Sequence, residues 1–279
     1  MRMAVHFAPL CFCQVIVLGV RGSMPRCIEC NALVRRIVQP ETEMVDKCVR
    51  CGRCCDKYYE FADVQKWIDV VLLERRAWTH VLYNQRGIFS SLFLAAVFCC
   101  LIEAYVVRTT CVYAELRGGK DLFSATQDSN WGGGEDSLQL VRNLRSEMLP
   151  RMMYPETWPT LFLYACLEYL LCLVSAVWLG VQSQRGVAPG QDDAMTTWAT
   201  SLSLTYTAKL GYLVFLVWRI PIPLVVVVDF VFLLWMVRGF RVAASNHPSR
   251  LLAVAAVTVT LLSRVLFRHF TGWSPQLIF

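Results

Sequence analysis

The chain has 279 residues, of which 56% are hydrophobic and only 17% are charged. Soluble domains average about 25% charged residues and disordered chains are poor in apolar residues, so the composition argues against both classes. The net charge of +6 does not indicate nucleic-acid binding, because most basic residues outside the first polar domain flank apolar runs. We therefore expect a polytopic membrane protein with one polar domain and no nucleic-acid partner.

The chain begins with an apolar segment, residues 3–20, interrupted by His6 and Gln14. A signal peptide is disfavoured, because Arg2 alone forms the positive region and residues 19–23 lack a small-x-small cleavage site. A short extra membrane segment and a mis-assigned start codon are the other interpretations. Residues 1–22 are therefore treated as a hydrophobic amino-terminal extension.

Charge is concentrated in residues 21–86, which hold 12 Lys and Arg and 9 Asp and Glu. This pattern predicts a polar domain over residues 23–86. Within it, apolar residues at spacings of three, four and seven predict a helix over residues 62–83. They are Val64, Trp67, Ile68, Val71, Leu72, Trp78 and Leu82. The helix either lies in the membrane interface or packs on the core of the polar domain, and the pattern does not separate the two.

The remainder, residues 87–279, is predicted to be a transmembrane helical region with four to five spans. Its apolar stretches are residues 88–107, 160–181, 198–237 and 251–267. The third is long enough for two spans, which Pro221 and Pro223 would divide, and Arg264 interrupts the last. With this arrangement, about twice as many loop Lys and Arg residues lie on the side of the polar domain, which places that domain in the cytosol.

The polar domain contains two C-x2-C pairs separated by 17 residues, namely Cys27, Cys30, Cys48 and Cys51. This spacing predicts a four-cysteine zinc site in a small zinc-ribbon-like domain. Four thiolates leave no open coordination position, so the zinc would be structural and would contribute to folding. A pair of disulfides is the competing interpretation, which the reducing cytosol opposes. Cys54 stays an alternative to Cys48, because Cys51 and Cys54 form a third C-x2-C pair.

Three charged residues lie well inside predicted spans, namely Glu168, Lys209 and Asp229. A charge at the bilayer centre costs about 2.5–3.5 kcal/mol, so we expect these side chains to share an intramembrane polar cluster. Lys209 and Asp229 fall at similar depths and are expected to pair. The cluster either lines a path for a lipid headgroup or a subunit contact, or it holds the helix bundle together.

The sequence lacks the patterns of common catalytic sites. Its four histidines are scattered, and it contains no nucleotide-binding glycine loop and no H-E-x-x-H motif. We therefore predict that the protein is not an enzyme and has no catalytic residues.

Residues 26–84 resemble the amino-terminal homology domain of the Arv-like family, the ACAT-related proteins required for viability. The resemblance rests on the two cysteine pairs, the Asp56-Lys57-Tyr58 segment, the Ile68-Asp69 helix with Leu72-Leu73, and the ending from His80 to Asn84. Asn31 stands where the family usually has glycine.

The resemblance implies a multi-pass endoplasmic reticulum protein of lipid homeostasis with no established catalytic reaction. Such a protein would assist sterol transport and distribution, sphingolipid balance and supply of glycosylphosphatidylinositol anchor precursors. Its partners would be these membrane lipids and lipid-biosynthetic membrane complexes. The alternative is a non-transporting adaptor whose zinc domain stabilises such a biosynthetic complex.

Overall fold

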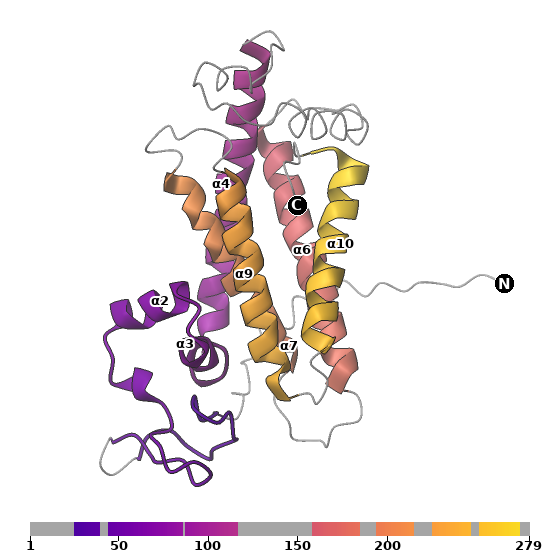
Figure 1. Ribbon diagram of the computed structural model, residues 1–279. Helices are drawn as coiled ribbons and strands as arrows, with labels where there is room; N and C mark the ends of the chain where they lie inside the picture. Colours follow the sequence, from indigo (N-terminus) through magenta and orange to yellow (C-terminus); the bar gives the residue numbers. More distant parts are fainter. Residues whose placement is uncertain are drawn as a thin grey trace, which may run out of the picture. The chain divides into compact units, whose positions relative to one another are not determined.

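The computed structural model describes residues 25–39, 44–85, 87–116, 158–184, 194–214, 225–246 and 251–273, and these are mostly helical (Figure 1). The predicted amino-terminal extension and the proline pair at residues 221 and 223 lie outside the described residues.

Among the described residues, three helices are long and apolar enough to cross a membrane: α4 (Ile88–Leu116), α6 (Trp158–Gln184) and α10 (Leu251–Thr271). They coincide with the first, second and last predicted apolar stretches, and α10 includes Arg264.

The third apolar stretch is less regular than expected. Helix α7 (Ala194–Tyr206) has 13 residues and continues into the 3-10 helix η4 (Thr207–Gly211). At a rise of about 1.5 Å per residue, α7 alone is too short to span a bilayer. Helix α9 (Val225–Ala243) has 19 residues but contains Asp229, Arg238 and Arg241. A total of four or five spans therefore stays a prediction.

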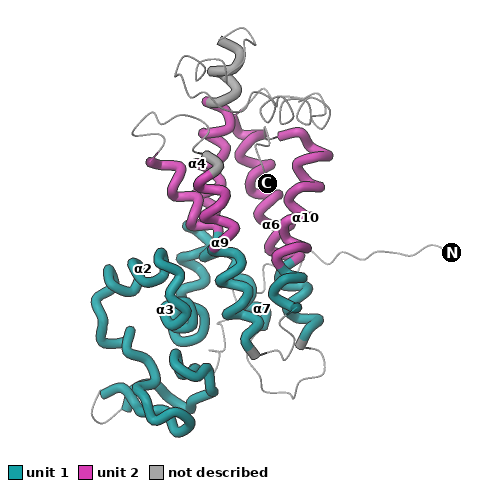
Figure 2. Tube along the Cα trace, viewed as in Figure 1, with its two compact units in different colours: residues 1–95, 176–205, 235–256 teal, residues 96–175, 206–234, 257–279 magenta. Residues whose placement is uncertain are grey.

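The chain divides into two compact units (Figure 2). Unit 1 comprises residues 1–95, 176–205 and 235–256, and unit 2 comprises residues 96–175, 206–234 and 257–279. Unit 1 therefore contains the predicted polar domain together with segments of the helices that follow it in the chain. The predicted cysteine cluster belongs to unit 1, and the predicted charge cluster belongs to unit 2.

The cysteine-rich part of unit 1 is built from turns and short antiparallel bridges. Three isolated bridges pair Arg26 with Leu33, Val38 with Val45, and Lys47 with Cys54. The first and third close the chain around the two C-x2-C turns. Because the described residues of this segment form bridges instead of longer strands, the zinc-ribbon fold stays a prediction.

The single helix predicted over residues 62–83 is broken in the structure. It consists of α2 (Asp63–Val71), α3 (Arg75–Thr79) and a π-helical turn, η2 (His80–Asn84). The break lies at Leu73, whose φ is 61°. The Leu73 N–H donates to Val70 O, and the Glu74 N–H donates to Asp69 O. This is the Schellman pattern that ends helices, and it usually has glycine at the left-handed position.

The break divides the periodic apolar residues into two groups. Val64, Trp67, Ile68 and Val71 on α2 are exposed, as is the cap residue Leu72, and Val70 is the one buried residue of this helix. Trp78 is fully buried after the break, where its indole N–H donates to Val70 O and its ring packs on Trp235. The apolar face of α2 therefore lies open, as an interfacial helix requires, while α3 packs into the core of unit 1.

Candidate functional site

The four predicted metal ligands lie together in unit 1. The Sγ atoms of Cys27, Cys30, Cys48 and Cys51 are all within 4.8 Å of one another. The Cys27–Cys51 separation is 3.7 Å and the Cys30–Cys48 separation is 3.6 Å. A tetrahedral zinc site with Zn–S bonds of about 2.3 Å requires S···S edges of ~3.8 Å. The cluster therefore fits a closed tetrahedral zinc site.

The backbone forms both cysteine turns in the same way. The Cys27 N–H donates to Ala32 O, and the Cys48 N–H donates to Arg53 O. The residue after the second cysteine of each turn is left-handed, Asn31 with φ 59° and Gly52 with φ 70°. Asparagine is one of the few residues that adopt this conformation readily, so Asn31 replaces the usual glycine with little strain.

The pKa values of the thiols in the cluster are shifted in opposite directions. Burial raises the pKa of the Cys27 thiol well above its usual range. Burial also acts to raise the pKa of Cys48, but hydrogen bonds to the backbone N–H groups of Cys51 and Arg50 outweigh it and lower that pKa to about 7. A buried thiolate needs a compensating charge, and a coordinated metal ion deprotonates the thiol outright.

The other two cysteines of the segment lie outside this cluster. Cys48 belongs to the group of four close thiols, whereas Cys54, the alternative ligand, is exposed and does not belong to it. Cys55 is buried, and its backbone links the two turns by donating to Asp46 O and accepting from the Ile28 N–H. Burial raises the pKa of Cys55 to about 12, which suits an apolar packing residue.

A buried polar network in unit 1 joins the residues that carried the family resemblance. The Asp56 carboxylate is fully buried and lies 2.6 Å from both His80 Nδ1 and Asn84 Nδ2. Asn84 bonds to both backbone polar groups of Arg26, beside the first cysteine turn. The Tyr58 hydroxyl donates to Asp69 on α2. Motifs separated in the sequence therefore meet in one network that fixes η2 and α2 to the cysteine turns.

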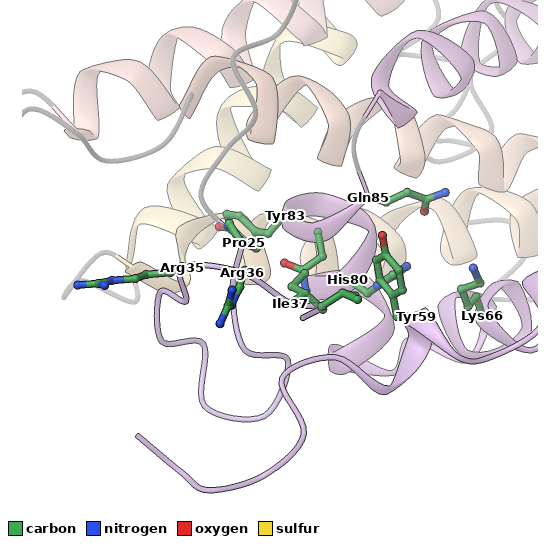
Figure 3. A pocket seen from close by; sticks show the side chains of 11 residues that line it. Pro25, Arg35, Arg36, Ile37, Tyr59, Lys66, His80, Tyr83 and Gln85 are labelled. Carbon is green, nitrogen blue, oxygen red and sulfur yellow. The ribbon is translucent and has the colours of Figure 1, made fainter. Parts of the chain in front are cut away.

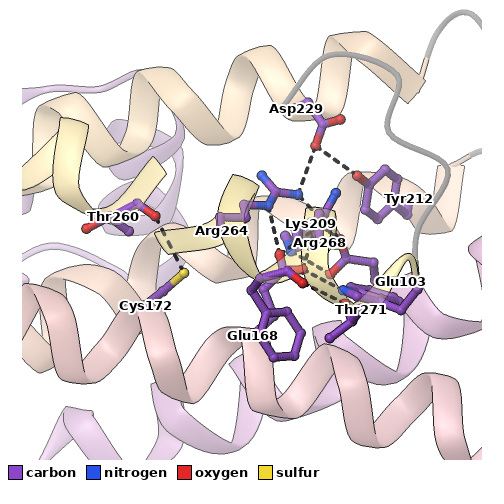
Figure 4. A network of polar contacts seen from close by, with 12 residues as sticks. Glu103, Glu168, Cys172, Lys209, Tyr212, Asp229, Thr260, Arg264, Arg268 and Thr271 are labelled. Carbon is purple, nitrogen blue, oxygen red and sulfur yellow. Dashed lines mark hydrogen bonds and ion pairs between the residues drawn. The ribbon is translucent and has the colours of Figure 1, made fainter. Parts of the chain in front are cut away.

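In unit 2, the predicted polar residues belong to one buried cluster of six charges (Figure 4). Three are carboxylates, Glu103, Glu168 and Asp229, and three are cations, Lys209, Arg264 and Arg268. Each is less than 9% exposed. Helices α4, α6, α9 and α10 and the turn η4 all contribute to it.

Direct pairing inside this cluster differs from the expected pairing. Lys209 Nζ lies 2.5 Å from Glu103 Oε2, so Lys209 pairs with Glu103 instead of Asp229. Asp229 accepts from the Tyr212 hydroxyl at 3.1 Å and lies 3.5 Å from Arg264. Depth alone did not determine the partner, because Asp229 already contacts two other side chains.

Glu168 is held by the two arginines of α10. Arg264 Nε lies 2.8 Å from Glu168 Oε1, and Arg268 Nε lies 2.6 Å from Oε2. Arg268 Nη2 also donates to Oε1 at 2.8 Å, and the Trp273 indole N–H adds a fourth donor at 2.9 Å. Arg264 and Arg268 were not among the predicted cluster residues, although their spacing of four places them on one face of a helix. The sequence could have indicated these two arginines, because they stand at the end of a predicted span and the carboxylates Glu168 and Asp229 in other spans need cationic partners.

The cluster can neutralise itself, because it holds three formal negative and three formal positive charges. Aromatic rings line it, and Lys209 Nζ lies 4.4 Å from the Tyr206 ring centroid. Pairing of this kind offsets the free-energy cost of burying charges inside a membrane, and it links several helices. Its geometry therefore fits a bundle-stabilising role.

These features define a helical membrane protein with a cluster of four cysteines that could hold a metal ion. The model of the Arv1-like family matches residues 26–240, and the chain belongs to this family. This finding confirms the resemblance seen in residues 26–84 and extends it through most of the helical region.

Curated relatives match over a shorter segment. The chain is 35% identical to Protein ARV1 of Homo sapiens over 85 residues, which cover 29% of this chain and 30% of that protein. It is 34% identical over 85 residues to Protein ARV1 of Mus musculus and of Bos taurus, with 31% and 29% of those proteins covered. The match thus spans about a third of each relative's length. No solved structure matches the chain.

Proposed function

We propose that this protein is an endoplasmic reticulum membrane protein of lipid homeostasis. Membership of the Arv1-like family carries the proposal, and three helices long and apolar enough to cross a membrane support it. Its lipids would be sterols, sphingolipids and precursors of glycosylphosphatidylinositol anchors, whose movement or distribution it assists. The protein acts without catalysing a covalent reaction.

In this proposal the cysteine domain faces the cytosol and holds one structural zinc. The close approach of Cys27, Cys30, Cys48 and Cys51 supports the metal, and the excess of basic residues on that side supports the orientation. When bound, zinc supplies a fold-stabilising link between the two cysteine turns. The hydrogen bonds of Asp56 with His80 and Asn84 then hold η2, which precedes α4 in the chain, in place against the cysteine turns.

Reconstitution of the purified full chain in liposomes tests whether it handles lipid by itself. Transfer of fluorescent sterol or ceramide between protein-containing donor and empty acceptor liposomes should exceed that of protein-free controls. Heat-denatured protein is the matched control. Transfer at the protein-free rate, for both lipids, would contradict autonomous lipid handling.

The alternative is an adaptor whose zinc domain stabilises a lipid-biosynthetic complex. The open apolar face of α2 and the self-neutralised charge cluster favour this reading, since both can serve structural contacts. An adaptor would move no lipid in liposomes but would co-purify with biosynthetic membrane proteins from cells.

A further inference from the structure

A polar cavity of about 540 Å³ opens in unit 1, next to the Asp56–His80 pair (Figure 3). Three basic side chains line it, those of Arg35, Arg36 and Lys66, and none of the described residues that line it carries a carboxylate. Its size is within the range of about 300–1,000 Å³ typical of small-ligand sites. The lining therefore selects for an anion.

The basic residues keep donors available for such an anion. Arg36 Nε lies 3.1 Å from Asp46, but the Arg36 side chain is 60% exposed and its guanidinium has further N–H groups. Lys66 lies 2.6 Å from Asp63, whose side chain is 85% exposed. Each pair has one exposed partner only, because the Asp46 and Lys66 side chains are 20% and 18% exposed. Ion pairs that solvent reaches are weakly stabilising, so a phosphate with two negative charges can compete with these carboxylates for both cations. Arg35 pairs with no carboxylate among the described residues.

His80 adds a fixed polar group to the wall of the cavity. Its side chain is 5% exposed and Nδ1 lies 2.6 Å from the buried Asp56 carboxylate. A carboxylate that accepts from Nδ1 fixes the ring and leaves Nε2 as the polar ring atom for a ligand. Hydrogen phosphate suits this arrangement, because it offers anionic oxygens to Arg36 and Lys66 and an O–H group to Nε2.

We propose that this cavity binds the phosphate monoester or inorganic phosphate group. Guanidinium and ammonium groups are the usual partners of phosphate oxygens in proteins. A lipid headgroup is one source of this chemistry, since Lys66 belongs to α2, whose Val64 and Val71 are 72% and 58% exposed. Free phosphate is the other. The site is independent of the proposed function, because a protein that moves no lipid can also bind phosphate here.

Isothermal titration of the purified full chain in neutral detergent tests the site with two probes, inorganic phosphate and the soluble lipid dihexanoyl phosphatidic acid. We expect binding that weakens about tenfold in Arg36→Gln and in Lys66→Gln, because each variant loses charge-assisted hydrogen bonds. The charge-matched variant Arg75→Gln lies outside the cavity and should bind as the wild type does. Thermal unfolding of all variants checks that the fold is retained.

The two probes separate the sources. Binding of both probes, or of inorganic phosphate alone, assigns recognition to the phosphate group itself, whereas binding of the lipid alone assigns the site to a headgroup. The proposal is overturned if neither probe binds, or if Arg75→Gln weakens binding as much as Arg36→Gln and Lys66→Gln do.

Discussion

At the scale of single residues, neighbouring cysteines have different surroundings. Cys48 is buried among three other thiols within 4.8 Å, whereas Cys54 is exposed and lies outside that group. The spacing of the two cysteine pairs predicted the cluster because each C-x2-C turn is local. The choice between Cys48 and Cys54 required the tertiary structure, since both complete the same short motif.

This contrast predicts the metal content of the purified protein. Wild-type protein and Cys54→Ser should each contain one zinc per chain, measured by elemental analysis. Cys48→Ser should lose it, because three thiolates leave an incomplete tetrahedron. Equal zinc content in Cys48→Ser and Cys54→Ser would show that the assignment of ligands is wrong.

The pairing of Lys209 with Glu103 is a second residue-scale result that the sequence did not reveal. Glu103 lies 106 residues away in the chain, and only the packing of α4 beside η4 brings the two together. The sequence identified the charged residues whose burial in a membrane costs free energy, but their partners depend on which helix faces pack against each other.

A double-mutant cycle in detergent tests this pair. Lys209→Met should destabilise the protein by about 3–5 kcal/mol, because it removes one of the three cations that contact the buried Glu103 carboxylate and leaves an uncompensated charge in the cluster. Adding Glu103→Gln should recover a large part of that loss. The matched cycle of Lys209→Met with Asp229→Asn should be closer to additive, since these side chains do not pair directly. A stronger coupling to Asp229 than to Glu103 would reverse the assignment.

At the scale of elements, Leu73 divides the amino-terminal helical segment. Periodicity predicted one helix because the apolar spacing runs through residues 64–82, and a leucine gives no sign of a helix end. The left-handed conformation of Leu73 is supported from outside the segment, where Arg238 Nε donates to Leu73 O at 2.6 Å. The hydrogen bond from Arg238 therefore stabilises a helix break at Leu73, where the conformational preference of leucine opposes one.

Substitution at Leu73 should reveal the strain at this break. Leu73→Gly relieves it, whereas Leu73→Val places a β-branched side chain in a conformation that it rarely adopts. We expect the valine variant to be less stable than the glycine variant by about 1–2 kcal/mol. Chemical unfolding of both variants measures this difference, and a valine variant as stable as the glycine variant would argue against a left-handed Leu73.

At the scale of the whole molecule, the sequence predicted a membrane protein with a four-cysteine metal site. The family match and the helices agree with a membrane protein, and the four cysteines lie close enough together that they could hold a metal ion. The three long apolar helices were predictable because their composition alone identifies them. The third apolar stretch was not, because α7 gives way to a 3-10 turn at Thr207 while its hydrophobicity continues. The buried network around Asp56 was also hidden, since its members are up to 58 residues apart.

Orientation in the membrane is a whole-molecule prediction. A tag inserted before Cys27 should be digested by protease added to sealed microsomes, because the excess of basic residues predicts a cytosolic location for this domain. A luminal marker protein should stay intact in the same sample. Full protection of the tag would place the cysteines in the oxidising lumen, where disulfides become the favoured arrangement.

The lipid composition of cells lacking this protein tests its function together with its metal centre. Mass spectrometry of sterols, sphingolipids and glycosylphosphatidylinositol precursors should show altered levels that wild-type protein and Cys54→Ser restore. Cys48→Ser should fail to restore them at matched expression, because its amino-terminal domain cannot hold zinc. Unchanged levels of all three lipid classes in the deficient cells would contradict a role in lipid homeostasis.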